Sequence, residues 1–376
     1  MGIVVSKFGG SSLADAAGLR RCMQILTARR RRRFIVLSAP GRRFPGDTKI
    51  TDLLCARTEE GVRIARARFE ELSRALGVSL ERGLIEKSLD LRASPERLAS
   101  RGEYLVARVF SEFAQLPFVD AAELFHFDAR GRLLKAETTK SIRKMALKLH
   151  SAVIPGFYGS RPDGKIALFP RGGSDVTGAL LAAYLQAGIY ENWTDVDGLM
   201  SADPSLCPDA VCHPLVSYSQ MEAIARAGAN VLHPDCLKPL MEAGVPLVMR
   251  NTFSPALPGT YVSDSVRRSV YCACAQSGFG LLQSSDPGVM RLLEQLSAPE
   301  FLNADGERVY PVREYGSLAM ITVFGFSGIQ PPKSCIAIAQ DEGCARFLVP
   351  EEEKAAAVRA LHAQLLNAYR NKEPTQ

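Results

Sequence analysis

Two glycine pairs in this chain each stand beside one basic residue. Residues 7–12 read KFGGSS and follow a short apolar run, and residues 171–178 read RGGSDVTG and precede an apolar run with helical spacing. A helix start with exposed backbone N–H groups can bind carboxylate or phosphate. Lys7 adds a cation to the first pair, and Arg171 could bind a carboxylate through two parallel hydrogen bonds. The pattern predicts a site for small anions.

The sequence lacks the common nucleotide-binding and zinc-protease motifs. It contains no GxxxxGK[ST], no GxGxxG after a strand and no HExxH. Phosphoryl transfer needs charge neutralisation and alignment more than covalent help. Lys7 with Gly9 and Gly10 could supply both, and Asp175 could hold the lysine in place.

Two further segments fit a small-molecule kinase. Residues 193–198 (WTDVDG) follow an expected strand and run into residues 201–204 (SADP), and residues 100–103 (SRGE) begin an expected helix. Glu103 could hold an ammonium group. Each segment also has a purely structural interpretation, because Asp-Gly and Asp-Pro often mark loops and an early helical glutamate complements the helix dipole.

The elements that must position these residues alternate along residues 1–260. Strands are expected at 3–6 and 34–38, with a helix between them that has Leu19, Cys22, Met23 and Leu26 on one face. Residues 56–116 are charged and helical. This alternation predicts an α/β domain with a mostly parallel sheet, in which ligands bind beyond the carboxyl ends of the strands.

The pattern changes after residues 251–258 (NTFSPALP), which read as a linker. We expect one domain at 1–262 and a smaller α+β domain at 263–376. The expected strands of the second domain lie at 270–274, 278–282, 318–324 and 345–349, and its expected helices at 287–296 and 351–371.

Composition argues against several classes of partner. The chain has 46 Lys and Arg against 40 Asp and Glu, and the arginine run at 29–33 has no interleaved aromatic residues, so nucleic-acid binding is not expected. The nine cysteines contain no CxxC, and no zinc pattern or metal site is predicted. Reduced thiols, no signal peptide and no apolar run of about 20 residues favour a cytoplasmic protein without a membrane span.

Nine segments between residues 3 and 262 resemble, in the same order, the motifs of the aspartokinases, members of the amino-acid kinase superfamily. They are residues 7–12, 38–39, 51–54, 100–103, 156–159, 171–175, 194–198, 202–204 and 231–234. The resemblance implies a three-layer sandwich with a mostly parallel central sheet. It also implies that ATP, with its Mg²⁺, phosphorylates the side-chain carboxylate of L-aspartate to 4-phospho-L-aspartate, which begins lysine, threonine and methionine synthesis.

The resemblance also implies roles for single residues. Lys7 would stabilise the transferred phosphoryl group, and Asp175 would position Lys7. Glu103 would hold the ammonium group of aspartate and Arg171 its α-carboxylate, with Thr51 and Ser174 as further substrate contacts. The residues expected to contact ATP or its phosphates are Lys7, Gly9, Gly10, Ser11, Thr194, Asp195, Met200, Ser205, Asn230 and Val231.

Several nucleotide-side positions depart from the family. Tyr is usual at Met200, Arg at Ser205, Lys at Asn230 and Gly at Pro170. Two expected cations are therefore missing, and each lost charged contact to phosphate could cost about 1.5–3 kcal/mol. Weak nucleotide binding is expected unless another residue substitutes.

These departures keep two alternatives open. One is a divergent paralogue that phosphorylates a related acidic amino acid, and the other is a non-catalytic, ligand-binding or regulatory homologue. Retention of Lys7 and Asp175 argues against the second.

The C-terminal part resembles the paired ACT modules of aspartokinases in a shortened form. Residues 318–323 resemble a first ACT strand, and residues 344–349 with the following helix resemble an ACT ending. A segment with glycine and proline at 324–335 stands where a full module would carry a helix. The resemblance implies a homodimer formed through this domain, whereas the shortening argues against feedback control by lysine or threonine.

Overall fold

The computed structural model describes residues 2–170, 172–229, 231–266, 270–282, 300–303, 307–313, 316–325, 328–341 and 343–370. They form two compact units. The N-terminal unit comprises Met1–Gly198 and Val231–Ser265, and the C-terminal unit comprises Leu199–Asn230 and Val266–Gln376. Residues 199–230 thus group with the C-terminal unit, and the domain boundary expected at residue 262 stays a prediction.

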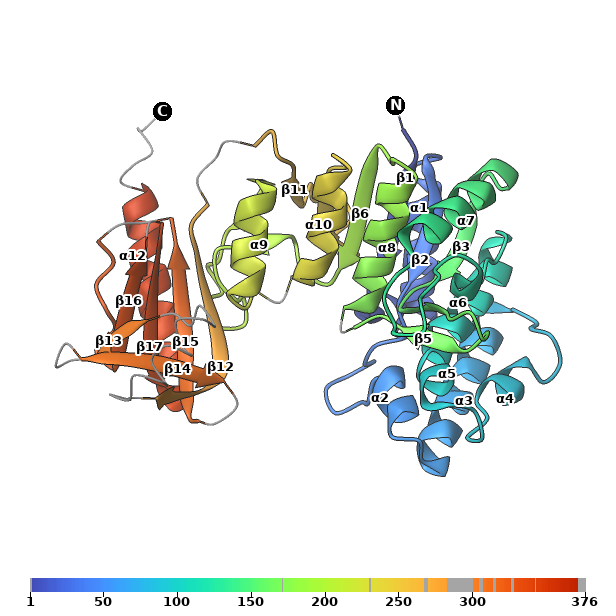
Figure 1. The fold of residues 1–376 in the computed structure, drawn as a ribbon, viewed down its shortest axis with the longest axis horizontal. Helices are drawn as coiled ribbons and strands as arrows, with labels where there is room; N and C mark the ends of the chain where they lie inside the picture. The colour runs from blue at the N-terminus through green and yellow to red at the C-terminus, as the bar shows by residue number, and fades with distance from the viewer. Residues whose placement is uncertain are drawn as a thin grey trace. The chain divides into compact units, whose positions relative to one another are not determined.

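The N-terminal unit is built on a mostly parallel sheet, as the alternation of elements predicted (Figure 1). Its strands lie in the order β3-β2-β1-β6-β10-β11, with the first five parallel and β11 antiparallel to β10. Their bounds are β1 Val4–Phe8, β2 Arg32–Leu37, β3 Ala152–Pro155, β6 Ile189–Thr194, β10 Leu247–Asn251 and β11 Thr260–Val262. Every residue of β1 is buried, as expected for a central parallel strand covered on both faces.

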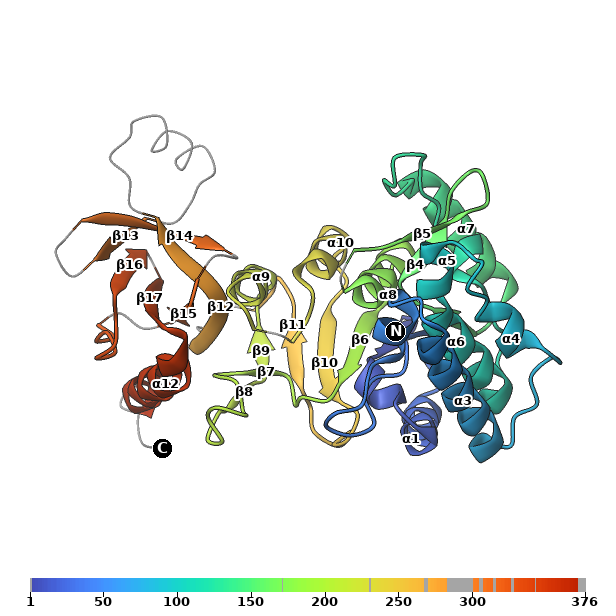
Figure 2. The same cartoon turned by 90° about the horizontal axis from the view of Figure 1, so that it is seen from below.

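Helices cover both faces of this sheet (Figures 1 and 2). On one face α8 packs on β1 and β6 and is itself covered by α7 and α10, and on the other α1, α3 and α6 share an apolar core with Phe8, Ile35 and Trp193. The three layers match the sandwich that the family resemblance implied. The bounds of the helices are α1 Ala16–Thr27, α2 Ile50–Cys55, α3 Glu59–Leu76, α4 Leu84–Ser88, α5 Pro95–Ala99, α6 Arg101–Ala114, α7 Lys135–Lys148, α8 Gly173–Tyr184 and α10 Leu237–Glu242.

Local sequence explains where α1 begins and which face it buries. Asp15 accepts a hydrogen bond of 2.7 Å from the Gly18 N–H and so caps the helix. Leu19, Cys22 and Leu26 are buried as predicted, whereas Met23 is only partly buried. Residues 56–116 carry α3 to α6, which confirms their helical character.

Short elements complete the N-terminal unit and connect to the second. The N-terminal unit also holds η1 Gly10–Leu13, η2 Ala121–Glu123, η3 Pro234–Cys236, β4 Tyr158–Ser160 and β5 Ile166–Leu168. Residues 199–230 contribute β7 Leu199–Met200, β8 Cys212–His213, β9 Leu215–Val216 and α9 Tyr218–Arg226.

The C-terminal unit contains an antiparallel barrel with strand order β12-β14-β13-β16-β17-β15, covered by α12. Its elements are β12 Cys272–Leu282, β13 Phe301–Asn303, β14 Arg308–Arg313, β15 Leu318–Phe324, β16 Ala337–Asp341, β17 Cys344–Pro350, η4 Glu351–Glu353 and α12 Lys354–Arg370. Val358, Leu361 and Leu365 of α12 pack on Ile321 and Phe347 of the strands. The small α+β, ACT-like character predicted for this region is confirmed.

The C-terminal unit differs from the sequence-based expectation in one strand. The prediction of two strands at 270–274 and 278–282 was wrong, because β12 runs through both. Gly278 has φ +87° and lies at an irregularity in the pairing with β15, so the glycine makes a bulge within one strand. The helix expected at 287–296 lies outside the described residues. Residues 328–336 contain no helix, in line with the shortened module.

Among the residues that the structure describes, none of the helices is both long and apolar enough to span a membrane.

Candidate active site

Lys7 and Asp175 lie together where β1 ends and α8 begins. Side chains alternate along β1, so Phe8 faces the core under α1 while Lys7 faces α8. The Lys7 Nζ is 2.6 Å from Asp175 Oδ1, and only 8% and 16% of these side chains are exposed. Asn192 of β6 is the neighbour of Lys7 in strand register, and its Nδ2 donates to Asp175 Oδ1 at 3.3 Å. Asp175 therefore holds the Lys7 ammonium group in one orientation, and Asn192 in turn holds Asp175.

The second glycine pair opens α8, as predicted. Gly172 precedes the helix with φ +74°, and a Cβ added there would lie 2.3 Å from the His233 side chain, so no other residue fits without rearrangement. Within the described part of the chain, no side chain forms a capping hydrogen bond at the start of α8, and Gly172, Gly173 and Ser174 line the adjoining cleft. This helix start is available for an anion.

The first glycine pair is wedged between β6 and the segment after β2. The Gly9 N–H donates to the Trp193 carbonyl at 2.9 Å, and the Gly41 N–H donates to the Gly10 carbonyl at 2.8 Å. A Cβ on Gly10 would lie 2.8 Å from the Ala39 carbonyl oxygen. The turn therefore depends on close backbone packing that only glycine permits.

These segments line one cleft of about 870 Å³, which lies within the N-terminal unit. Its volume is in the range usual for small-molecule sites. The structure brings together there eight of the residues predicted from the sequence: Lys7, Gly10, Ser11, Thr51, Glu103, Ser174, Asp175 and Asp195.

Glu103 lies in the first turn of α6 with its carboxyl group buried. Burial raises the pKa of Glu103 to about 8, although hydrogen bonds from the Glu103 and Ala39 backbone N–H groups and the charge of Arg101 act in the opposite direction. Its Oε2 has no hydrogen-bond partner among the described residues. A carboxyl oxygen left this way beside a cleft is suited to an incoming cation, such as an ammonium group.

Gly9, Thr194, Val231, Met200 and Ser205 are not among the residues that line the cleft. Thr194 ends β6, and its Oγ1 accepts from the Val196 N–H at 3.2 Å. Val231 belongs to the N-terminal unit, whereas Met200 and Ser205 belong to the C-terminal unit. Arg171 and Asn230 lie outside the described residues. The roles assigned to these residues stay predictions.

Sequence reasoning missed three side chains near the site. Asn192 was not singled out, because its place beside Lys7 depends on the register between β1 and β6. Arg42 and Lys49 also line the cleft. The sequence could have indicated both, because they are basic residues in the segment that follows the carboxyl end of β2, where parallel sheets bind ligands.

A buried polar cluster lies beneath the strands that carry the site. Arg32 Nε is 2.7 Å from Glu191 Oε2, and Ser6 and Trp193 also donate to Glu191. Burial acts to raise the pKa of Glu191, but the Arg32 guanidinium and these hydrogen bonds outweigh it and lower the pKa. The carboxylate therefore stays ionised and ties β2 to β6 across β1.

Comparisons with known sequences identify the family of this chain. The amino acid kinase family matches residues 2–251. Aspartokinase 3 of Bacillus subtilis (strain 168) is 32% identical over 307 residues, covering 73% of this chain and 67% of that protein. Lysine-sensitive aspartokinase 3 of Escherichia coli (strain K12) is 30% identical over 292 residues, covering 70% of this chain and 64% of that protein. The chain thus matches about two thirds of the length of these curated relatives.

Solved structures agree. Aspartate kinase from Clostridium acetobutylicum is 26% identical with a TM-score of 0.78, and the match covers 96% of this chain and 99% of that one. E. coli aspartokinase III in complex with aspartate and ADP shares the fold, with a TM-score of 0.81 at 23% identity over 97% of this chain and 100% of that one. This chain therefore belongs to the amino acid kinase family and, within it, to the aspartokinases.

Proposed function

We propose that this protein catalyses the ATP-dependent phosphorylation of the side-chain carboxylate of L-aspartate to 4-phospho-L-aspartate. The observation that carries the proposal is the convergence in one cleft of the Lys7–Asp175 ion pair and the unpartnered carboxyl oxygen of Glu103. Relatives at 30% identity or more are named aspartokinases, and a solved relative is named as binding aspartate and ADP. These names favour this activity over a divergent or non-catalytic homologue.

The reaction needs alignment and charge neutralisation rather than a general base. A β-carboxylate oxygen of aspartate forms a bond to the γ-phosphorus while the bond to the ADP oxygen breaks. The attacking carboxylate is already ionised at neutral pH, so no proton has to be removed. Lys7 neutralises charge on the transferred group, and the N–H groups at the start of α8 supply hydrogen bonds. Asp175 and Asn192 keep the lysine oriented.

Aspartate is held through its two other charged groups. Glu103 receives the ammonium group, whose charge favours the ionised form of the buried carboxyl. Arg171 binds the α-carboxylate, and Thr51 and Ser174 supply hydroxyl groups. The two ends of the substrate thereby fix the β-carboxylate for in-line attack.

The nucleotide enters with Mg²⁺ on its phosphates. Mg²⁺ in such sites takes one or two protein carboxylates together with phosphate oxygens and water. Asp195 lines the cleft and would supply such a carboxylate, whereas Asp175 is engaged by Lys7. Gly9, Gly10, Ser11, Thr194 and Val231, with Met200, Ser205 and Asn230, form the nucleotide side, and the absence of Arg and Lys at the last two positions gives a modest affinity for ATP.

We further propose a homodimer formed through the C-terminal unit and a cytoplasmic location. A single sedimentation-velocity run on the purified chain tests the first, because a monomer at micromolar concentration contradicts it.

Trapping the product with hydroxylamine tests the reaction directly. Purified protein, MgATP and L-aspartate should give an aspartyl hydroxamate signal that needs all three components. L-Glutamate and D-aspartate serve as matched acceptors. A signal from another acidic amino acid alone supports a divergent paralogue, and calorimetric binding of aspartate or ATP without product supports a non-catalytic homologue.

A further inference from the structure

The segment that joins β2 to α2 forms one wall of the cleft. Residues 41–49, here called the cleft loop, contain no helix or strand. Gly41, Arg42 and Lys49 from this loop line the cleft, and Thr51 and Asp52 follow directly after it. A loop without regular hydrogen bonds needs other contacts to keep one shape.

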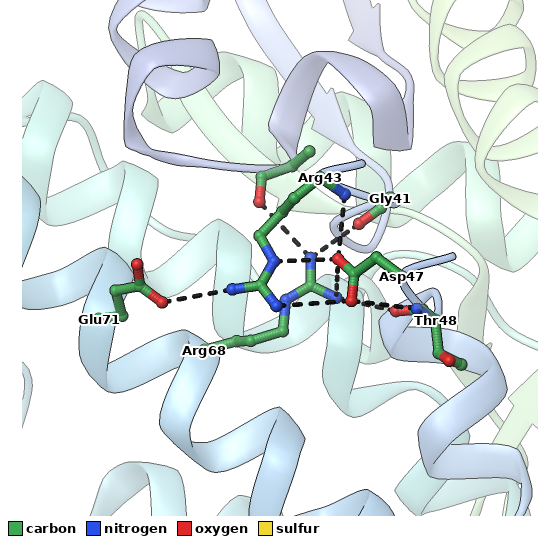
Figure 3. A network of polar contacts seen from close by, with 7 residues as sticks. Gly41, Arg43, Asp47, Thr48, Arg68 and Glu71 are labelled. Carbon is green, nitrogen blue, oxygen red and sulfur yellow. Dashed lines mark hydrogen bonds and ion pairs between the residues drawn. The ribbon is translucent and has the colours of Figure 1, made fainter. Parts of the chain in front are cut away.

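Arg68 of α3 supplies such contacts at both ends of the cleft loop. Its Nη2 donates to the Gly41 carbonyl at 2.7 Å, and its Nη1 donates to the Thr48 carbonyl at 2.9 Å (Figure 3). The side chain is only 4% exposed. One planar guanidinium thus joins the two ends, which a lysine ammonium cannot do with the same geometry.

Asp47 closes the loop on itself. Its carboxylate accepts from the Arg43 backbone N–H at 3.0 Å, the Arg43 Nε at 2.9 Å and the Thr48 N–H at 3.0 Å, and it lies 3.6 Å from Arg68 Nη1. Glu71 of α3 contacts the other side of Arg43 (Figure 3). These hydrogen bonds, that of Arg43 above all, lower the pKa of Asp47 to about 2, so the network is ionised across the working pH range.

The cleft loop is packed directly on the first glycine pair. The Gly41 N–H donates to the Gly10 carbonyl, and a Cβ on Gly41 would lie 2.7 Å from the Gly10 carbonyl carbon. Because no space separates the two backbones, a shift of Gly41 must move Gly10 as well. The contacts of Arg68 are therefore one residue removed from the proposed phosphate-binding turn.

We propose that Arg68 is a positioning residue for the reaction: it holds the cleft loop so that Gly41 supports Gly10 and so that Arg42 and Lys49 face the cleft. This inference rests on the proposed function. It assigns to these two cations a contribution to binding the anionic reactants. The simpler alternative is that Arg68 only stabilises the packing of α3.

Steady-state kinetics separate the two interpretations. We expect Arg68→Met to lower kcat/KM for aspartate about 10- to 100-fold, chiefly through a raised KM, because charged hydrogen bonds to two carbonyls are lost. Arg68→Lys should fall between this variant and the wild type. Arg63→Met is the matched control, since Arg63 lies on the same helix, is largely exposed and, among the described residues, pairs with Glu60 on the surface. It should behave as the wild type.

Two further measurements test whether Arg68 fixes the conformation of the cleft loop. Trypsin should cut the cleft loop after the exposed Arg42 or Arg43 faster in Arg68→Met than in the wild type or in Arg63→Met. Asp47→Asn should act on the same loop, so its kinetic effect and that of Arg68→Met should be clearly non-additive in the double variant.

The outcomes divide cleanly. Wild-type KM values and wild-type cleavage in a folded Arg68→Met overturn the inference, as does a fall in kcat alone that follows the fraction of folded protein. If Arg68→Met fails to fold, Arg68→Lys and Asp47→Asn decide by the same criteria. Absence of hydroxamate from the wild type overturns the proposed function instead, and the cleavage assay then still shows whether Arg68 holds the loop.

Discussion

At the residue scale, the cleft combines two kinds of charged group. One is the Lys7 ammonium group, which has a fixed partner, and the other is the buried carboxyl group of Glu103. Lys7 is oriented by Asp175, and Asp175 by Asn192. Glu103 is buried, and its Oε2 has no hydrogen-bond partner in the part of the chain that the structure describes. The first arrangement suits a group that must not move while charge develops, and the second suits a group that waits for a ligand.

Lys7→Ala should lower turnover about 10²- to 10³-fold while the protein stays folded, because one preorganised donor to the transferred phosphoryl group is lost. Hydroxamate formation and a thermal melt measure the two effects. Lys165→Ala, which removes an exposed lysine paired with Asp163, is the control. Near-normal turnover by Lys7→Ala would remove this lysine from the mechanism.

The raised pKa of Glu103 predicts a pH dependence of aspartate binding. Without ligand the group is protonated below about pH 8, and the ammonium group of aspartate requires the ionised form. The dissociation constant for aspartate should therefore fall as pH rises from 6 to 8, with proton release on binding. Calorimetry in two buffers of different ionisation enthalpy measures both, and an uptake of protons would contradict the assignment.

The raised pKa of Glu103 should also make stability depend on pH. Rising pH should strengthen aspartate binding but lower the free energy of unfolding. Between about pH 4.5 and 8 the folded state keeps a proton that the unfolded state has lost, so the free energy of unfolding falls as pH rises through this window. Glu103→Gln should thus melt at a higher temperature than the wild type at pH 9, with a smaller difference at pH 4. Glu112→Gln, on the exposed part of the same helix, should show no such change.

At the scale of elements, the site exists because the end of β1, the start of α8 and the cleft loop meet at one place. β1 delivers Lys7, α8 begins with uncapped N–H groups, and the cleft loop after β2 presses Gly41 on Gly10. The strands are locked together beneath the site by the buried Arg32–Glu191 pair, with Ser6 and Trp193 as further donors. The position of Lys7 relative to Asn192 depends on this alignment.

Breaking that buried pair should destabilise the fold strongly. Arg32→Met should lower the free energy of unfolding by about 3–5 kcal/mol, because it leaves an uncompensated buried carboxylate. The double variant Arg32→Met, Glu191→Met should recover much of this loss, since no charge then remains buried. Urea denaturation measures both, and additive losses in the double variant would show that the pair does not act as a unit.

At the scale of the whole molecule, the chain joins a kinase unit to a small antiparallel barrel. The C-terminal unit includes residues 199–230, which carry two positions predicted to face the nucleotide, Met200 and Ser205. Ser205 donates through its N–H and Oγ to Asp203 Oδ1, so its side chain closes a local turn. Two residues predicted to contact the nucleotide therefore group with the C-terminal unit, and their role stays a prediction.

Ser205→Arg should tighten ATP binding, because it supplies a cation at a position where the resemblance to aspartokinases implies one. A charged contact to phosphate predicts a gain on the order of tenfold or more. The single tryptophan, Trp193, accepts the Gly9 N–H at its carbonyl and offers a fluorescence signal for the titration. Ser219→Arg, a change on the exposed start of α9, is the control. Unchanged or weaker affinity in Ser205→Arg would disprove the account of the missing cation.

Local patterns in the sequence were enough to predict the parallel sheet, the glycine pairs and the helix start at Gly172, whereas the resemblance to aspartokinases implied the Lys7–Asp175 partnership and the shortened C-terminal module. Turn conformation, helix starts and burial periodicity depend on neighbouring residues, which the sequence displays directly. Other features required the folded chain. Asn192 reaches Asp175 through strand register, and Arg68 reaches the carbonyl of Thr48, which lies 20 residues before it. The strand β12 continues through a glycine bulge, where two separate strands were expected. Each depends on which distant backbones pack together, and no short-range signal specifies that packing.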